Sequence, residues 1–105
     1  MEKFLYFENA ATDSTCIPAR RLVEMEMDGS GTALDLRFSG PKSADDATQY
    51  EVELTIDDNT GTEVMRAISE QIRFGKDPFI VIADDTNSSY AHSSITAVAT
   101  LPALV

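Results

Sequence analysis

Hydrophobic and polar residues alternate with a period of two along three stretches of the chain, which predicts three β-strands. The hydrophobic members are Val23, Met25 and Met27, then Leu34, Leu36 and Phe38, and then Tyr50, Val52, Leu54 and Ile56. The sequence DGSG lies between the first two stretches, and its glycines can take the positive φ values of a tight turn. The first two strands are therefore predicted to form a hairpin, and the polar stretch 39–48 to be a loop.

Two other stretches are short apolar runs. KFLYF at 3–7 and PFIVIA at 78–83 are bounded by polar residues, and each is typical of a strand covered on both faces. A last alternating strand is predicted over 95–101, before Pro102. The polar stretches 8–19 and 84–93 are predicted to be loops.

The period changes to that of a helix after residue 60. Val64, Ile68 and Ile72 lie four residues apart and form an apolar stripe, while Gly75 suits the C′ position and Pro78 prevents continuation. A single helix cannot support a doubly wound parallel sheet. The sequence thus predicts an α+β, mainly β fold: one domain over 1–105, an antiparallel barrel or sandwich of about six strands, with one helix at about 61–74.

Charge and cysteine content narrow the range of partners. The chain contains 8 Lys and Arg residues and 18 Asp and Glu residues. The resulting net charge of −10 should repel phosphate backbones and anionic lipid surfaces. We therefore expect neither nucleic acid nor a membrane as partner. Cys16 is the only cysteine, so an intrachain disulfide cannot form. The start of the chain is not typical of a signal peptide.

The stretch TIDDNTGTEV at 55–64 is a candidate site. Asp57 and Asp58 could bind a divalent cation, although their spacing does not fit an EF-hand loop. The alternative is a helix start, because Thr60-Gly61-Thr62-Glu63 fits a capping box. In that interpretation the Thr60 hydroxyl accepts a hydrogen bond from the Glu63 amide.

A second acidic pair, Asp84 and Asp85, follows the apolar run at 78–83. Carboxylates at the end of a buried strand can hold Mg²⁺ or act as a base. The alternative is an exposed loop with Asx-type turns. The four aspartates are candidate metal ligands, and they would form one site only if both loops lie at the same edge of the fold.

Nucleophilic catalysis has few candidates in this sequence. His92 is the only histidine and could in principle serve as a base for Cys16 or a serine. No nucleophile-elbow motif surrounds any serine. We therefore interpret His92 as an exposed polar residue, and we predict no catalytic residue, no cofactor and no enzymatic activity.

Two surfaces are candidates for interaction. The polar sides of the alternating strands should share one face around Arg37, which is either solvated or a docking surface for a basic partner; its acidic residues are Glu24, Glu26, Asp35, Glu51 and Glu53. The last strand has an uncharged outer face and an apolar tail, which favours pairing with another chain. The predicted interface residues are Thr96, Val98, Thr100, Leu101, Leu104 and Val105.

The run FLYF, the hairpin RRLV…LDLRF, the helix start GTEVMRAI and the segment FIVIADD together resemble small uncharacterised proteins of marine bacteriophages, of the cyanophage type. This resemblance implies a small viral protein, located in the host cytoplasm or the virion. Our leading expectation is a non-enzymatic structural or interaction protein that self-assembles as a homo-oligomer, with the phage particle as its setting. The alternative is a small ligand- or divalent-cation-binding module, with hydrolytic activity as one form, that uses Asp57, Asp58, Asp84 and Asp85.

Overall fold

The computed structural model describes residues 2–27, 29–39 and 49–104, and it is mainly β. In chain order the elements are β1 (Phe4–Ala10), β2 (Asp13–Pro18), the 3₁₀ turn η1 (Ala19–Arg21), β3 (Leu22–Met27), β4 (Ala33–Ser39), β5 (Gln49–Ile56), α1 (Gly61–Phe74), β6 (Phe79–Asp84), β7 (Ser89–Tyr90) and β8 (Ile95–Leu104). Helix α1 has the predicted bounds, 61–74. The predicted loop at 39–48 and the turn residue Asp28 lie outside the described residues, apart from Ser39 at the end of β4.

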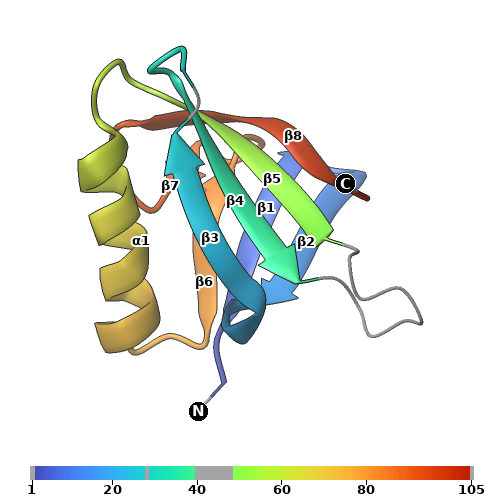
Figure 1. The fold of residues 1–105 in the computed structure, drawn as a ribbon. Coiled ribbons are helices and arrows are strands. Elements are labelled where there is room, and N and C mark those ends of the chain that lie inside the picture. Colours follow the sequence, from blue (N-terminus) through green and yellow to red (C-terminus); the bar gives the residue numbers. More distant parts are fainter. Residues whose placement is uncertain (1, 28, 40–48, 105) are drawn as a thin grey trace.

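The strands form two four-stranded sheets, in the orders β2-β1-β6-β7 and β3-β4-β5-β8 (Figure 1). All neighbours in the second sheet are antiparallel, and the hairpin of β3 and β4 is confirmed. The first sheet has one parallel pair, β1 with β6. The described residues contain eight strands where about six were predicted, because β2 and β7 lie in the stretches 8–19 and 84–93 that were predicted to be loops.

The two sheets share one hydrophobic core. Leu5 and Phe7 of β1 enter it from the first sheet, and Leu36 and Phe38 of β4 enter it from the second. The rings of Phe7 and Phe38 meet edge to face, with centroids 6.1 Å apart. Val64 and Ile68 of α1 complete this core from the side, as the predicted apolar stripe requires. Figure 1 shows the helix standing beside the two sheets rather than across either outer face.

The helix begins at the predicted residue but not with the predicted capping box. The Thr60 hydroxyl donates to the Asp57 carbonyl at 2.7 Å, and no side chain caps the first turn. The capping prediction is therefore wrong in its chemistry, because the Thr60 hydroxyl closes the preceding turn instead of accepting from the helix. The role predicted for Gly75 also differs. Its φ is −64°, and glycine is needed there because a Cβ would lie 2.5 Å from the Gln71 carbonyl oxygen.

Strand β8 is irregular along its length. Its pairing with β5 shifts register at three places, so β8 contains extra residues relative to its partner. Such bulges bend a strand and increase its twist. Accordingly, β8 crosses the end of the molecule where α1 begins, and it also lies against β1 and β6 of the first sheet (Figure 1).

Candidate functional site

The outer face of the first sheet carries an apolar surface. Two cross-strand rows build it: Phe4 lies between Pro18 and Phe79, and in the next row Tyr6 lies between Cys16 and Val81. Paired residues of neighbouring strands project to the same side of a sheet. We call these six residues the apolar rows. The ring centroids of Tyr6 and Phe79 are 5.0 Å apart, so the two rows are in contact.

The apolar rows are accessible to solvent. Phe4 and Phe79 are 37% and 46% exposed, and Cys16 is also exposed. Sequence reasoning missed this surface, because FLYF and FIVIA were predicted to be covered on both faces. A signal was present in the first run: Leu5 and Phe7 are fully buried, whereas Phe4 and Tyr6 share the opposite face. The run therefore has the period of two that a strand with one covered face shows.

The third row on this face is acidic. It consists of Glu8, with Ser14 on one side and Asp84 on the other. The Tyr6 hydroxyl donates to the Glu8 carboxylate, and this hydrogen bond, with burial, raises the pKa of Tyr6. The outer face of the first sheet thus changes along the strands from apolar at the start of β1 to acidic at its end.

The outer face of the second sheet is charged, as predicted. The strand register places Glu24, Glu26, Asp35, Glu51 and Glu53 on one side, together with Arg37. The Arg37 guanidinium donates to Glu24 and Glu26 at 2.7 Å and to Glu51 at 3.1 Å. The hydrogen bonds that Arg37 donates to Glu26 and Glu24 raise the pKa of Arg37. The guanidinium also forms an ion pair with Asp35 at 3.8 Å, so Arg37 holds together carboxylates from β3, β4 and β5.

The two aspartate pairs have different surroundings. Asp84 is 6% exposed, so the exposed loop that the sequence allowed is wrong for this residue; its carboxylate accepts hydrogen bonds from the backbone and side-chain nitrogens of Asn87, three residues further on. Asp57 and Asp58 are exposed. Gly31, with φ of +84°, packs against Asp58: a Cβ on Gly31 would lie 2.8 Å from a carboxylate oxygen of Asp58. Asp58 thus lies against the turn between β3 and β4.

Asp85 connects the two sheets. Both of its carboxylate oxygens accept from the Val98 N–H of β8 at 3.1 Å, and one accepts from the Tyr90 hydroxyl at 3.0 Å. Burial and the hydrogen bond to Asp85 raise the pKa of Tyr90. Within the described ranges no three His, Cys, Asp or Glu side chains are grouped so that they could hold a metal ion. The four candidate aspartates are therefore not brought together as one site.

Cys16 and His92 occupy separate parts of the fold. Cys16 lies in β2 within the apolar rows, whereas His92 lies between β7 and β8, where its Nδ1 accepts from the Ser94 N–H at 3.0 Å. His92 is half-buried rather than exposed as predicted. Partial burial raises the pKa of the Cys16 thiol, which lowers its thiolate fraction at neutral pH.

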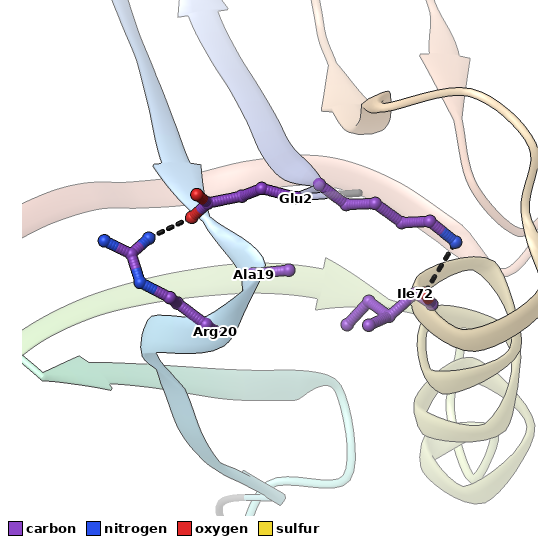
Figure 2. A pocket seen from close by; sticks show the side chains of 5 residues that line it. Glu2, Ala19, Arg20 and Ile72 are labelled. Carbon is purple, nitrogen blue, oxygen red and sulfur yellow. Dashed lines mark hydrogen bonds and ion pairs between the residues drawn. The ribbon is translucent and has the colours of Figure 1, made fainter.

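A pocket of about 340 Å³ lies between η1 and the C-terminal end of α1 (Figure 2). Its lining residues are Glu2, Lys3, Ala19, Arg20 and Ile72. The Lys3 ammonium donates to the carbonyls of Gly75 at 2.6 Å, Ile72 at 2.7 Å and Gln71 at 3.3 Å, so it caps the helix. Figure 2 shows Arg20 and Glu2 paired with each other. The charged groups of this pocket are therefore already engaged within the chain.

The interface predicted on β8 is only partly at the surface. Thr96 and Thr100 are exposed and Leu101 is half-buried, but Val98 is 4% exposed and belongs to the core. The placement of Val98 on an outer face is wrong, because the bulges of β8 interrupt the strict alternation on which it rested. The side chain of Leu104 and the whole of Val105 lie outside the described residues.

Among the residues that the structure describes, none belongs to a helix long and apolar enough to cross a membrane. Comparison with known proteins found no match: no family model fits the chain, and no curated protein or solved structure is significantly similar to it.

Proposed function

We propose that this protein is a non-enzymatic structural or interaction protein that works as a homo-oligomer, and that copies associate through the apolar rows on the outer face of the first sheet. The observation that carries the proposal is the contiguity of six uncharged side chains in two adjacent rows, with Phe4 and Phe79 exposed at their edge. Single exposed apolar residues are ordinary on protein surfaces, whereas contiguous apolar patches are typical of interaction sites.

Electrostatics favours this face for self-association over the outer face of the second sheet. Two copies of a chain with a net charge of −10 repel each other, and the repulsion is greatest where carboxylates face carboxylates. The apolar rows carry no charge. Phe74 is more exposed, at 72%, but it stands alone at the end of α1 beneath the Arg73 guanidinium, 5.4 Å from its ring centroid.

Strand β2 adds a second reason, because it is the edge of the first sheet next to the apolar rows. Edge strands that avoid pairing usually carry charges along their length. Asp13 is the only charged residue in β2, and it stands at the first position. The resemblance to cyanophage proteins favours an assembly role, and we propose a phage particle as its setting.

For the architecture, we propose a sandwich rather than a closed barrel. In the described part of the chain the two sheets have separate strand ladders, and α1 contributes to the core at the side. This arrangement leaves the outer face of each sheet free for separate contacts. The acidic outer face of the second sheet is then available to a basic protein partner.

Light scattering coupled to size exclusion tests the proposal. We expect the wild-type mass to be a multiple of the chain mass, and we expect Phe4→Lys/Phe79→Lys to be a folded monomer, because two buried ammonium groups would oppose the contact. The matched control is Thr96→Lys/Thr100→Lys, which adds the same charge to the predicted β8 surface. A wild type that stays monomeric at the highest soluble concentration would overturn self-association. Dissociation of the β8 variant alone would assign the interface to β8 instead.

The alternative function, a divalent-cation module at the aspartate loops, is tested by thermal shift with Ca²⁺, Mg²⁺ and Mn²⁺. A cation at a hundred times its Kd should stabilise the protein by about 2.7 kcal/mol. We expect no shift, because Asp84 and Asp85 already accept hydrogen bonds from the chain. A shift that Asp57→Asn/Asp58→Asn removes would favour the alternative.

A further inference from the structure

Charge is unevenly distributed between the two ends of the first sheet. At the end where β1 and β6 begin, the segments 2–3, 19–21 and 73–78 contain five cationic residues and two carboxylates, Glu2 and Asp77. The five are Lys3, Arg20, Arg21, Arg73 and Lys76. At the opposite end, the segments 8–13 and 83–85 contain four carboxylates and no cation: Glu8, Asp13, Asp84 and Asp85. Asp84 is buried and Asp85 binds Val98 and Tyr90 within the chain, so Glu8 and Asp13 are the ones nearest to a second copy. The apolar rows therefore lie next to a basic end and run toward an acidic one.

The backbone fixes this segregation. Phe4 pairs with both Pro18 and Phe79, so the residues flanking these three positions are neighbours at one end of the sheet. The Phe4 N–H donates to the Pro78 carbonyl at 2.7 Å, and the Ala19 N–H donates to the Lys3 carbonyl at 2.8 Å. In the same way, Glu8 pairs with Ser14 and Asp84 at the other end. The apolar face thus has positive charge at one end and negative charge at the other. Two copies of this face bring unlike charges together only when their strands run antiparallel.

From this arrangement, and resting on the proposed self-association, we infer that two copies stack their apolar rows face to face about a two-fold axis, with the β2 strands of the two copies antiparallel, so that Arg20 of each copy lies near Asp13 of the other. A parallel arrangement would place basic ends together and acidic ends together. The antiparallel arrangement places unlike ends together twice, because a two-fold contact repeats every interaction. Complementary charge of this kind fixes the register of an interface more than it adds affinity.

Arg20 and Asp13 are suited to this contact. The Arg20 side chain is 62% exposed in spite of its pairing with Glu2, and a guanidinium has five N–H donors, so it can engage a second carboxylate. Asp13 is exposed at the start of β2. With Arg20 of η1 near Asp13 of the other copy, the two-fold axis passes close to Cys16, which lies about midway between Asp13 and Arg20. The exposed Cys16 of one copy then lies close to that of the other, which gives the arrangement an independent reporter.

A charge swap tests the orientation. Sedimentation equilibrium would be measured for wild type, Arg20→Asp and the exchanged pair Arg20→Asp/Asp13→Arg, with Arg66→Asp on the exposed side of α1 as the control of equal charge. We expect Arg20→Asp to raise the dimer Kd about tenfold, since like charges then meet twice. The exchanged pair should return to within about threefold of wild type, and the control should change the Kd by less than about twofold.

Thiol cross-linking gives the second readout. A short bis-maleimide should couple Cys16 to Cys16 in wild type, with a yield that rises with protein concentration and falls in Phe4→Lys/Phe79→Lys. If wild type dimerises through the apolar rows but the exchanged pair binds as weakly as Arg20→Asp, or Cys16 does not cross-link, the antiparallel orientation is overturned while self-association stands. If wild type is a monomer throughout, the proposed function itself fails.

Discussion

The outer faces of the two sheets are built by the same alternation of residues but have opposite chemistry. On the second sheet, two outward residues of each of β3, β4 and β5 are charged, and Arg37 binds carboxylates from all three strands. On the first sheet, the corresponding positions of β1, β2 and β6 are aromatic, aliphatic or sulfur-containing over two rows. Both faces lie over the same hydrophobic core. The two sheets therefore differ in the side chains on their outer faces and not in the core beneath them.

The charged face therefore favours solubility, whereas the apolar face favours association between copies. A charged face with a central cation is well hydrated and repels a second copy of itself. An apolar face adds little to the stability of the single chain where its rings remain exposed, but it gains from burial against a partner. We therefore expect substitutions in the shared core to change the free energy of unfolding most. Substitutions on the charged face should affect stability within one chain, and substitutions on the apolar face should affect association between chains.

The largest effect should come from the core that both faces share. Phe38 is fully buried and contacts Phe7 across the two sheets. Phe38→Ala should cost about 3–5 kcal/mol of unfolding free energy because it leaves a cavity. Urea unfolding followed by far-UV circular dichroism and by tyrosine fluorescence measures it, and both signals should share one midpoint. Phe74→Ala, at an exposed ring, should change stability by only about 0.5 kcal/mol. Two separate midpoints would contradict a common core.

The next largest loss of stability should come from removing Asp85, which connects the two sheets. Asp85→Ala removes the carboxylate that accepts from the Val98 N–H and the Tyr90 hydroxyl. Leaving a half-buried N–H without an acceptor should cost about 1–3 kcal/mol, measured by urea unfolding. Asp57→Ala, at an exposed aspartate of the other pair, is the control and should be nearly neutral. Equal losses in the two variants would mean that Asp85 is not specifically structural.

The second sheet was the part of the fold most open to prediction. In β3, β4 and β5 hydrophobic residues alternate with polar ones, six of them charged, so the pattern predicted these strands, their inner face and the acidic surface around Arg37. The helix was equally readable, because Val64, Ile68 and Ile72 recur at its period. Both signals are local, since each depends on residues that lie close together in the sequence.

The first sheet was less predictable, for physical reasons. Strand β2 has the sequence DSTCIP, with small side chains and no alternation, and its strand conformation comes from pairing with β1. The parallel pairing of β1 with β6 joins residues 75 positions apart, as in Phe4 with Phe79, and no local pattern encodes it. Val98 shows the same dependence on context, because bulges in β8 moved a residue from the expected surface into the core.

Tyr90→Phe should have a smaller effect that depends on pH. It removes the hydrogen bond to Asp85 and should cost about 0.5–1.5 kcal/mol near neutral pH. The pKa of Tyr90 is raised above its usual 10.0 by burial and by Asp85. The folded state therefore holds this proton more tightly than the unfolded state, so the contribution is complete below about pH 10 and is lost as the pH rises through the folded-state pKa. In urea titrations from pH 8 to higher values, wild type should lose more stability than the variant. Parallel losses would show that Tyr90 does not carry this dependence.

The smallest expected effect concerns the charged face itself, and it completes the comparison with the apolar one. Arg37→Met keeps most of the aliphatic stem but leaves Glu24, Glu26 and Glu51 without their common cation. The urea midpoint should fall at low salt because the carboxylates then repel one another, and the loss should shrink as NaCl is added. Arg66→Met on the helix should show neither change. A deficit that is equal at all salt concentrations would point to packing of the side chain instead. Phe79→Lys should behave in the opposite way. At a concentration where wild type is monomeric, its unfolding midpoint should stay close to that of wild type, whereas at higher concentration its association is lost, because one face acts within the chain and the other between chains.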